Sequence, residues 1–177
     1  MQRTMRRHML RILSFIVLIF SQSFDSPAQS INELDSKGGF KEFKIGDSIT
    51  VHESKIRFSR VLDNADTKLY LVKDLVSVKS YTGEVELEFY KGKVQEVIVT
   101  FKNSKKEGFD DILKSLETLY GPYSKDKEKS KDSERFDKSY VWNGNRIKLR
   151  IGYDEKRKQT ELLYTENTSL EKLKEEF

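Results

Sequence analysis

The stretch at 84–101, EVELEFYKGKVQEVIVTF, constrains the fold of this chain more than any other part of it. Apolar and polar side chains alternate on both sides of Lys91-Gly92, and an alternation with a period of two is typical of a strand with one buried face. A two-residue turn at Lys91-Gly92 would join the two halves as a hairpin. The stretch therefore predicts an antiparallel sheet that buries one of its faces.

This hairpin needs an irregularity to keep its charges out of the core. A turn at Lys91-Gly92 pairs Phe89 with Val94, but a regular continuation would then turn Glu96 toward the buried face. A bulge near Gln95-Glu96, where two residues oppose one, returns the apolar residues to that face. We therefore predict a bulge there, which restores the pairs Val97 with Leu87 and Val99 with Val85.

Other strands are expected on both sides of this hairpin. A second two-residue turn at Thr82-Gly83 would pair Val78 with Leu87 and Lys79 with Glu86. Asn143-Gly144 is a strong hairpin signal as well. The remaining strands are expected at 55–61, with Ile56 and Phe58 turned inward, within 69–81, at 140–142, at 147–153 and at 160–166.

A main helix is expected after Phe101, where apolar residues begin to recur at intervals of three and four. Ser104 is a candidate N-cap and Gly121-Pro122 a stop signal, which places the helix at about 105–120. Its apolar stripe would pack on the hairpin that precedes it. Thr168 and Glu171 form a capping box for a short C-terminal helix. The fold class is therefore predicted as α+β, an antiparallel sheet with one main helix on one face. The stripe consists of Phe109, Ile112, Leu113, Leu116 and Tyr120.

The first thirty residues have the composition of a secretory signal. A basic start and the apolar run ILSFIVLIF at 12–20 precede small residues, with cleavage expected after Ala28. That run is much shorter than the roughly 20 residues that span a bilayer, and the chain has no cysteine for a lipid anchor. We therefore expect a bacterial periplasmic or secreted protein, with no stable membrane anchor after signal removal.

The remainder of the chain is expected to form one domain. Residues 31–39 are polar with little periodicity and are expected to be flexible. Residues 40–177 have the length of a single α+β domain. Within them, 124–138 carries charges of both signs and is expected to be a solvated loop.

Composition excludes several chemistries. His8 lies in the expected signal, so His52 is the only other histidine, and it is expected at an exposed strand end. One histidine without cysteine cannot form a thiol nucleophile, an iron–sulfur site or a Cys/His zinc site. The loop around Asp63 lacks the glycine and glutamate of an EF-hand, and no nucleotide-binding motif occurs. We therefore predict no enzyme, no cofactor and no metal site.

Net charge argues against a nucleic-acid partner. Removal of residues 1–30 would take away four basic residues and one acidic residue from totals of 33 and 29. The balance of 29 basic and 28 acidic residues leaves a nearly neutral chain, whereas nucleic-acid binding requires a basic surface. The expected partner is therefore another protein.

Two rows of charge are the candidate binding surface. The glutamates of 84–88 alternate with apolar residues, as do the basic residues of 146–150, so both rows are expected on the solvent face. They either form a solvated face with cross-strand pairs of about 0.2–1 kcal/mol each or dock a charged partner. The alternative site is an aromatic platform of Trp142, Tyr140 and Tyr153 for a glycan or small ligand, unless these rings pack in the core. The binding candidates are Glu84, Glu86, Glu88, Arg146, Lys148, Arg150 and Trp142.

The order of these parts resembles a family of small exported bacterial domains. The start FKEFKIGDSI, the hairpin LEFYKGKVQEVIVTF, the helix end LYGPY and the strands VWNGNRIKLRIGY and LLYTE are similar to domains of the beta-lactamase-inhibitor-protein-like and SmpA/OmlA-like type. The resemblance covers about 40–165. The chain departs from it by a strand-like ITVHESKIRF, where the family begins a helix after the glycine turn, and by its lack of cysteine. The resemblance implies an α+β layer that binds proteins through its sheet, as an exported, non-catalytic binding or envelope accessory protein.

Overall fold

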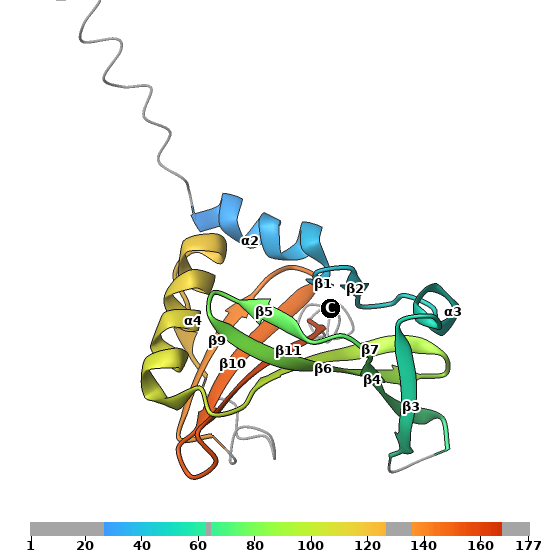
Figure 1. Ribbon diagram of the computed structural model, residues 1–177. Coiled ribbons are helices and arrows are strands. Elements are labelled where there is room, and N and C mark those ends of the chain that lie inside the picture. The colour runs from blue at the N-terminus through green and yellow to red at the C-terminus, as the bar shows by residue number, and fades with distance from the viewer. Residues whose placement is uncertain (1–26, 63–64, 127–135, 168–177) are drawn as a thin grey trace, which may run out of the picture.

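The computed structural model describes residues 27–62, 65–126 and 136–167 and has the predicted α+β class (Figure 1). The helices are α2 (Pro27–Lys37), α3 (Ile49–His52) and α4 (Lys105–Tyr120). The strands are β1 (Gly39–Phe40), β2 (Phe43–Lys44), β3 (Ile56–Val61), β4 (Thr67–Val72), β5 (Val76–Val78), β6 (Tyr81–Tyr90), β7 (Lys93–Phe101), β8 (Ser124–Lys125), β9 (Lys138–Asn143), β10 (Ile147–Asp154) and β11 (Gln159–Glu166).

One large antiparallel sheet dominates the structure. Its strands follow the order β3-β4-β6-β7-β11-β10-β9-β8, and β5 continues the flank of β6 that β4 begins. The last strand of the chain, β11, therefore lies between β7 and β10 rather than at an edge. A separate small hairpin, β1-β2, lies beside β7 and β11.

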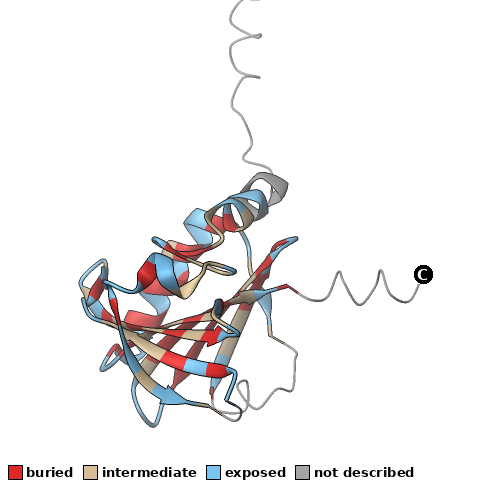
Figure 2. Ribbon diagram, turned by 90° about the vertical axis from the view of Figure 1, so that its right-hand side faces the viewer, coloured by how far each residue is buried: buried red, intermediate tan, exposed pale blue. Residues whose placement is uncertain are grey.

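The core lies between one face of this sheet, which we call the inner face, and the helices with β1-β2 (Figure 2). All five residues of the predicted stripe of α4 are buried, as expected for a helix that packs through one face. α4 packs over β10, β11 and α2, and not mainly over the hairpin that precedes it. Gly121 ends the helix with a φ of 76°, and Ser104 bonds to Thr160 instead of capping α4 with its side chain.

The bulge in the central hairpin is confirmed. The register of β6 and β7 shifts between Glu88 and Phe89, so that Phe89 pairs with Val94 and the buried pairs further along are those predicted. Gln95 is the extra residue. The turn at Lys91-Gly92 has φ values of 49° and 78°, which fits a primed two-residue turn.

The turn predicted at Thr82-Gly83 is wrong. The chain reverses at Lys79-Ser80 instead, with Lys79 at a φ of 51°, and Val78 pairs with Tyr81. The expected pairs of Val78 with Leu87 and of Lys79 with Glu86 are therefore not formed. Gly83 is buried inside β6, where a Cβ atom would lie 2.9 Å from the ring of Phe101. Its small size serves this close approach and not a turn.

Residues 31–39, expected to be flexible, include the second half of α2 and the start of β1. Leu34 is completely buried. The carboxylate of Asp35 accepts hydrogen bonds from the backbone N–H groups of Asn145, Arg146 and Ile147, at 2.7, 2.9 and 2.9 Å. The buried side chain of Leu34 and the carboxylate of Asp35 thus attach this helix to the domain, although most of its residues are polar.

The remaining expectations have mixed outcomes. The hairpin around Asn143-Gly144 and the last strand are present. β3 forms with Ile56 buried, but Phe58, which we expected to be turned inward, is 55% exposed and packs against the ring of Tyr70. In the expected loop 124–138, β8 and the buried Phe136 are ordered parts of the fold.

Residues 127–135, most of the expected signal and the expected C-terminal helix lie outside the described residues. No helix within the described ranges is long and apolar enough to cross a membrane.

Candidate functional site

Both predicted rows of charge lie on the face of the sheet opposite α4, which we call the outer face. The register runs from Glu86 through Ile98 and Leu163 to Arg150, so these four side chains share one face. Strands β7 and β11 separate the acidic row from the basic one. Glu86 and Arg150 are therefore not cross-strand neighbours, and the two rows form separate surfaces.

The acidic row lines a cavity of about 310 Å³, which we call the acidic concavity. Glu161 of β11 adds a fourth carboxylate to it, and it is bonded by the side-chain amide of Gln159 at 2.6 Å. Lys102 approaches both carboxylate oxygens of Glu84, at 2.8 and 2.9 Å. The charged residues of the concavity are Glu84, Glu86, Glu88, Glu161, Arg60 and Lys102.

Glu161 was not among the predicted site residues. The sequence shows only that it lies in the last strand, and nothing local indicates that this strand inserts beside β7. Its register opposite Thr100 brings it to the acidic row. Only the order of the strands, which is a tertiary property, could have identified it.

The basic row is not a uniform exposed surface. Arg150 is buried and forms an ion pair with Asp126, with 2.6 Å between Nε and Oδ2, so it is not the exposed docking residue that we expected. Lys148 is half-buried. Arg146 is exposed and lines a cavity of about 660 Å³, together with Lys93, Glu96, Glu166 and uncharged residues. That cavity carries charges of both signs.

The aromatic platform predicted as the alternative site is absent. Trp142 is buried, its indole N–H donates to the carbonyl of Gly121 at 2.8 Å, and it packs against Tyr123. Tyr153 is buried against Phe109. Tyr140 is half-buried and stacks on Phe109. These rings pack in or against the core between α4 and the sheet, as the alternative interpretation of the sequence predicts.

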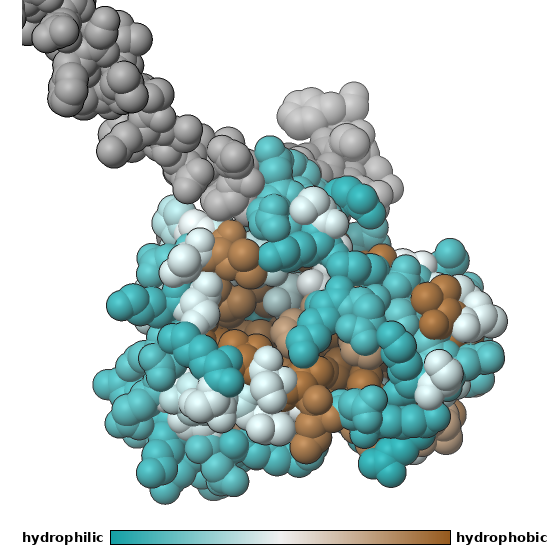
Figure 3. Space-filling model, turned by 45° about the horizontal axis from the view of Figure 1, so that its top comes forward, coloured by the Kyte–Doolittle hydropathy of each residue, from teal (hydrophilic) through white to brown (hydrophobic). Residues whose placement is uncertain are grey.

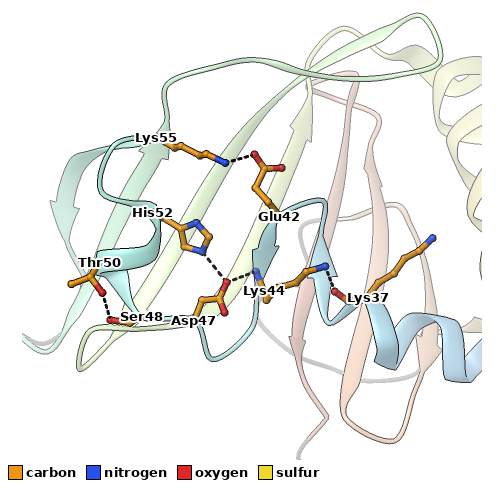
Figure 4. A network of polar contacts seen from close by, with 8 residues as sticks. All are labelled: Lys37, Glu42, Lys44, Asp47, Ser48, Thr50, His52 and Lys55. Atoms are coloured by element: carbon orange, nitrogen blue, oxygen red, sulfur yellow. Dashed lines mark hydrogen bonds and ion pairs between the residues drawn. The ribbon is translucent and has the colours of Figure 1, made fainter.

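His52 is neither exposed nor on a strand (Figure 4). It ends α3, is 2% exposed, and its Nε2 lies 2.9 Å from Oδ2 of Asp47. The ring of Phe43 packs against the imidazole at 5.1 Å between centroids. No hydroxyl group within the described ranges bonds to this imidazole, so a Ser/His/Asp triad is not formed there. Four residues, ITVH, form α3 where the β-branched composition favoured a strand.

The polar contacts around His52 link the β1-β2 hairpin, α3 and the residues before β3. Asp47 also accepts a hydrogen bond from the backbone of Lys44, and Lys55 pairs with Glu42 at 3.1 Å (Figure 4). A backbone hydrogen bond, followed by the Lys55 ammonium group, lowers the pKa of the Glu42 carboxyl. We interpret this network as structural, because it links β2, α3 and β3.

The described residues offer little for metal chemistry. Within the ranges that the structure describes, no group of three or more His, Cys, Asp or Glu side chains is arranged to hold a metal ion. Asp63 and Asn64, considered as oxygen ligands, lie outside those ranges.

Comparisons with protein-family models, with curated proteins and with solved structures found no match to this chain.

Proposed function

We propose that this chain is an exported, non-catalytic binding protein that holds a basic segment of another protein in the acidic concavity. The observation that carries the proposal is the row of three glutamates of β6, which meet the buried Glu161 of β11 in one hollow of the outer face. Among the described lining residues of this hollow, four carry carboxylates and two, Arg60 and Lys102, carry cationic groups. A lysine or arginine side chain is the group that complements such a surface.

The geometry of the concavity favours an extended partner. Glu84, Glu86 and Glu88 follow one another at every second position of β6, so their carboxylates are spaced along the strand by about 6.6 Å. A partner strand repeats its side chains with the same period. Alternate basic residues of an extended segment therefore match the acidic row.

Export is part of the proposal. Cleavage after Ala28 would remove only the first two residues of α2 and would keep Leu34 and Asp35, which attach that helix to the domain. The short helix α3 also follows the Gly46 turn, at the position where the exported family named above begins a helix. Both points support an exported domain of that general type.

A peptide titration tests the proposed function. A fluorescent peptide with alternating arginine and threonine would be titrated with the full chain and followed by anisotropy at low salt. The variant E86Q/E88Q is expected to bind about two- to thirtyfold more weakly, because two ion pairs of about 0.2–1 kcal/mol each are lost. The matched control is E117Q, which removes an exposed carboxylate from α4.

Two results would contradict the proposal. One is equal binding of the peptide by E86Q/E88Q and by E117Q. The other is equally tight binding of a peptide in which glutamate replaces arginine. Affinity should also fall as salt rises, because the proposed contacts are screened by ions.

A further inference from the structure

The side of the molecule that carries the helices has a second hollow, unrelated to the acidic concavity. It has a volume of about 480 Å³ and lies between α4, β1 and β5, with β11 at its floor. Figure 3 shows apolar side chains exposed in a depression at the centre of this side. We call it the lysine-rimmed hollow. Its apolar and aromatic residues are Phe40, Val78, Ile112, Leu116, Leu119, Tyr120, Leu162 and Tyr164.

The charged residues of this hollow all have one sign. Lys37, Lys41 and Lys44 line it, and none of its described lining residues carries a carboxylate. Lys37 is paired with Glu33 at 3.2 Å, and Lys44 donates to the carbonyl of Lys37 at the end of α2. The ammonium group of Lys41 lies over the ring of Phe40, 5.7 Å from its centroid. Along the sequence from residue 31 onward, by contrast, charges of both signs are interspersed.

The shape and polarity of the hollow suit a small ligand better than a protein segment. Ligand pockets measure roughly 300–1,000 Å³ and are mostly apolar, with a few polar groups that fix orientation. An apolar interior would bind a hydrocarbon chain, and a rim of lysines would favour a ligand with an anionic end. A single-chain molecule with a terminal carboxylate satisfies both conditions.

We propose that the lysine-rimmed hollow binds a long-chain fatty acid, with its alkyl chain between α4 and β5 and its carboxylate at the lysines. This site is independent of the proposed function, because it lies on the inner side of the sheet and shares no residue with the acidic concavity. The chain would thus have a ligand site on one side and a protein site on the other.

Chain length is the first measurable consequence. Burial of one methylene group contributes about 0.8 kcal/mol, so affinity should rise about fourfold per added methylene until the alkyl chain fills the hollow. Isothermal titration of the full chain with octanoate, decanoate and dodecanoate, each below its micelle concentration, measures this increase. Dodecyltrimethylammonium, which has a similar apolar chain and a cationic head, is expected to bind more weakly than dodecanoate.

The single tryptophan of the chain reports on the position of the ligand. Trp142 packs against Tyr120, a lining residue of the hollow, with 6.4 Å between ring centroids. Dodecanoate with a bromine atom near its methyl end should therefore quench Trp142 fluorescence with a saturable dependence on concentration. Binding in the acidic concavity would not do so, because that site lies on the opposite face of the sheet.

Two variants separate the head group from the alkyl chain. K37Q/K41Q is expected to weaken dodecanoate binding by roughly 1.4- to 5-fold per lysine and to leave dodecanol binding unchanged. S115W places a bulky ring at a half-buried lining position of α4 and should weaken both ligands. The matched control is K156Q, in the exposed turn between β10 and β11, which should bind dodecanoate as the unchanged chain does. Circular dichroism checks that each variant is folded.

The proposal is overturned by any of three results. These are no saturable binding of dodecanoate to the folded full chain, equal affinity for dodecanoate and dodecyltrimethylammonium, or dodecanoate binding that S115W does not affect. The peptide titration with E86Q/E88Q tests the other face of the sheet. A negative result there would not contradict fatty-acid binding, and a negative result with dodecanoate would not contradict peptide binding.

Discussion

The pairs β6-β7 and β10-β11 differ in how they are buried, although β6 and β10 both alternate apolar with other residues. β11 has the continuous apolar run Leu162-Leu163-Tyr164. Along β6, buried and half-exposed positions alternate regularly. Along β10, every position except Lys148 is buried, and in β11 the positions from Thr160 to Tyr164 are all buried (Figure 2). The sheet is therefore covered on one face at β6-β7 and on both faces at β10-β11. Alternation along β10 therefore identified a strand but did not show that its second face is covered.

The connection between α4 and β9 accounts for part of this difference. Asp126, at its start, forms the buried ion pair with Arg150 on the outer face of β10. Phe136, at its end, packs on Gly152, where a Cβ atom would lie 2.4 Å from the ring. Both residues come from the stretch with the most charges in the chain. A charged composition thus indicated exposure for a segment that buries the side chains of Asp126 and Phe136.

The largest expected effect comes from the buried ion pair. R150A would leave the carboxylate of Asp126, whose side chain is 2% exposed, without its guanidinium, and should lower the free energy of unfolding by about 3–5 kcal/mol. Urea denaturation measures this loss. R146A, which removes an exposed arginine from the same row, is the control and should change stability by about 0.5 kcal/mol or less. Equal effects of the two variants would show that the outer face of β10 is open.

A cross-strand pair on the outer face tests where the covered part of that face, at β10-β11, gives way to the open part, at β6-β7. Leu163 of β11 lies opposite Ile98 of β7, and Leu163 is buried whereas Ile98 is half-exposed. L163A should cost about 2–5 kcal/mol of unfolding free energy, because a buried side chain leaves a cavity. I98A should lower the free energy of unfolding by less than L163A does, and the two losses should differ by about 1 kcal/mol or more. If both variants lost the same stability, the cover would extend over β7 as well.

A glycine substitution tests the contact that covers β10. G152A should destabilise the fold by about 1–3 kcal/mol, because the new methyl group collides with the ring of Phe136. The same change in a F136A background should cost much less, since the ring is then absent. Thermal or urea unfolding of the four proteins gives the coupling. The absence of coupling would contradict the packing of Phe136 on this glycine.

Alkaline pH should lower the free energy of unfolding through Tyr164, a buried residue of β11. Burial raises the pKa of this β11 phenol well above its ordinary value. Below about pH 10 both the native and the unfolded chain keep the proton; above it only the unfolded chain ionises, so the free energy of unfolding falls by up to about 1.4 kcal/mol per pH unit. Y164F should show a shallower fall between about pH 10 and 12 and the same pH dependence as the unchanged chain between about pH 7 and 9. An unchanged alkaline slope would contradict this.

The smallest effect is expected at the open face. K102A removes the partner of Glu84 from a pair in which both side chains are about half-exposed, and should cost about 0.2–1 kcal/mol. Added salt should reduce the difference further, because exposed charges are screened. A cost as large as that of R150A would mean that the acidic concavity is buried and cannot receive a partner.

The features that sequence predicted are those encoded by local spacing. The stripe of α4 and the bulge near Gln95 follow from periods of three to four and of two, and both are present. The turn assigned to Thr82-Gly83 failed because Gly83 is required by a ring from another strand. The acidic row was predicted on the correct face, but Arg150, Trp142 and Glu161 depend on contacts with residues distant in sequence. Such contacts leave no periodic signal.

The carboxylate of Asp35 also has a consequence for the order of folding. It binds the backbone of a loop up to 112 positions further along the chain, so α2 cannot take its native place until most of the polypeptide is available. Contacts of such long separation slow the folding of small domains. A newly made chain would therefore dock α2 only after the central hairpin has formed.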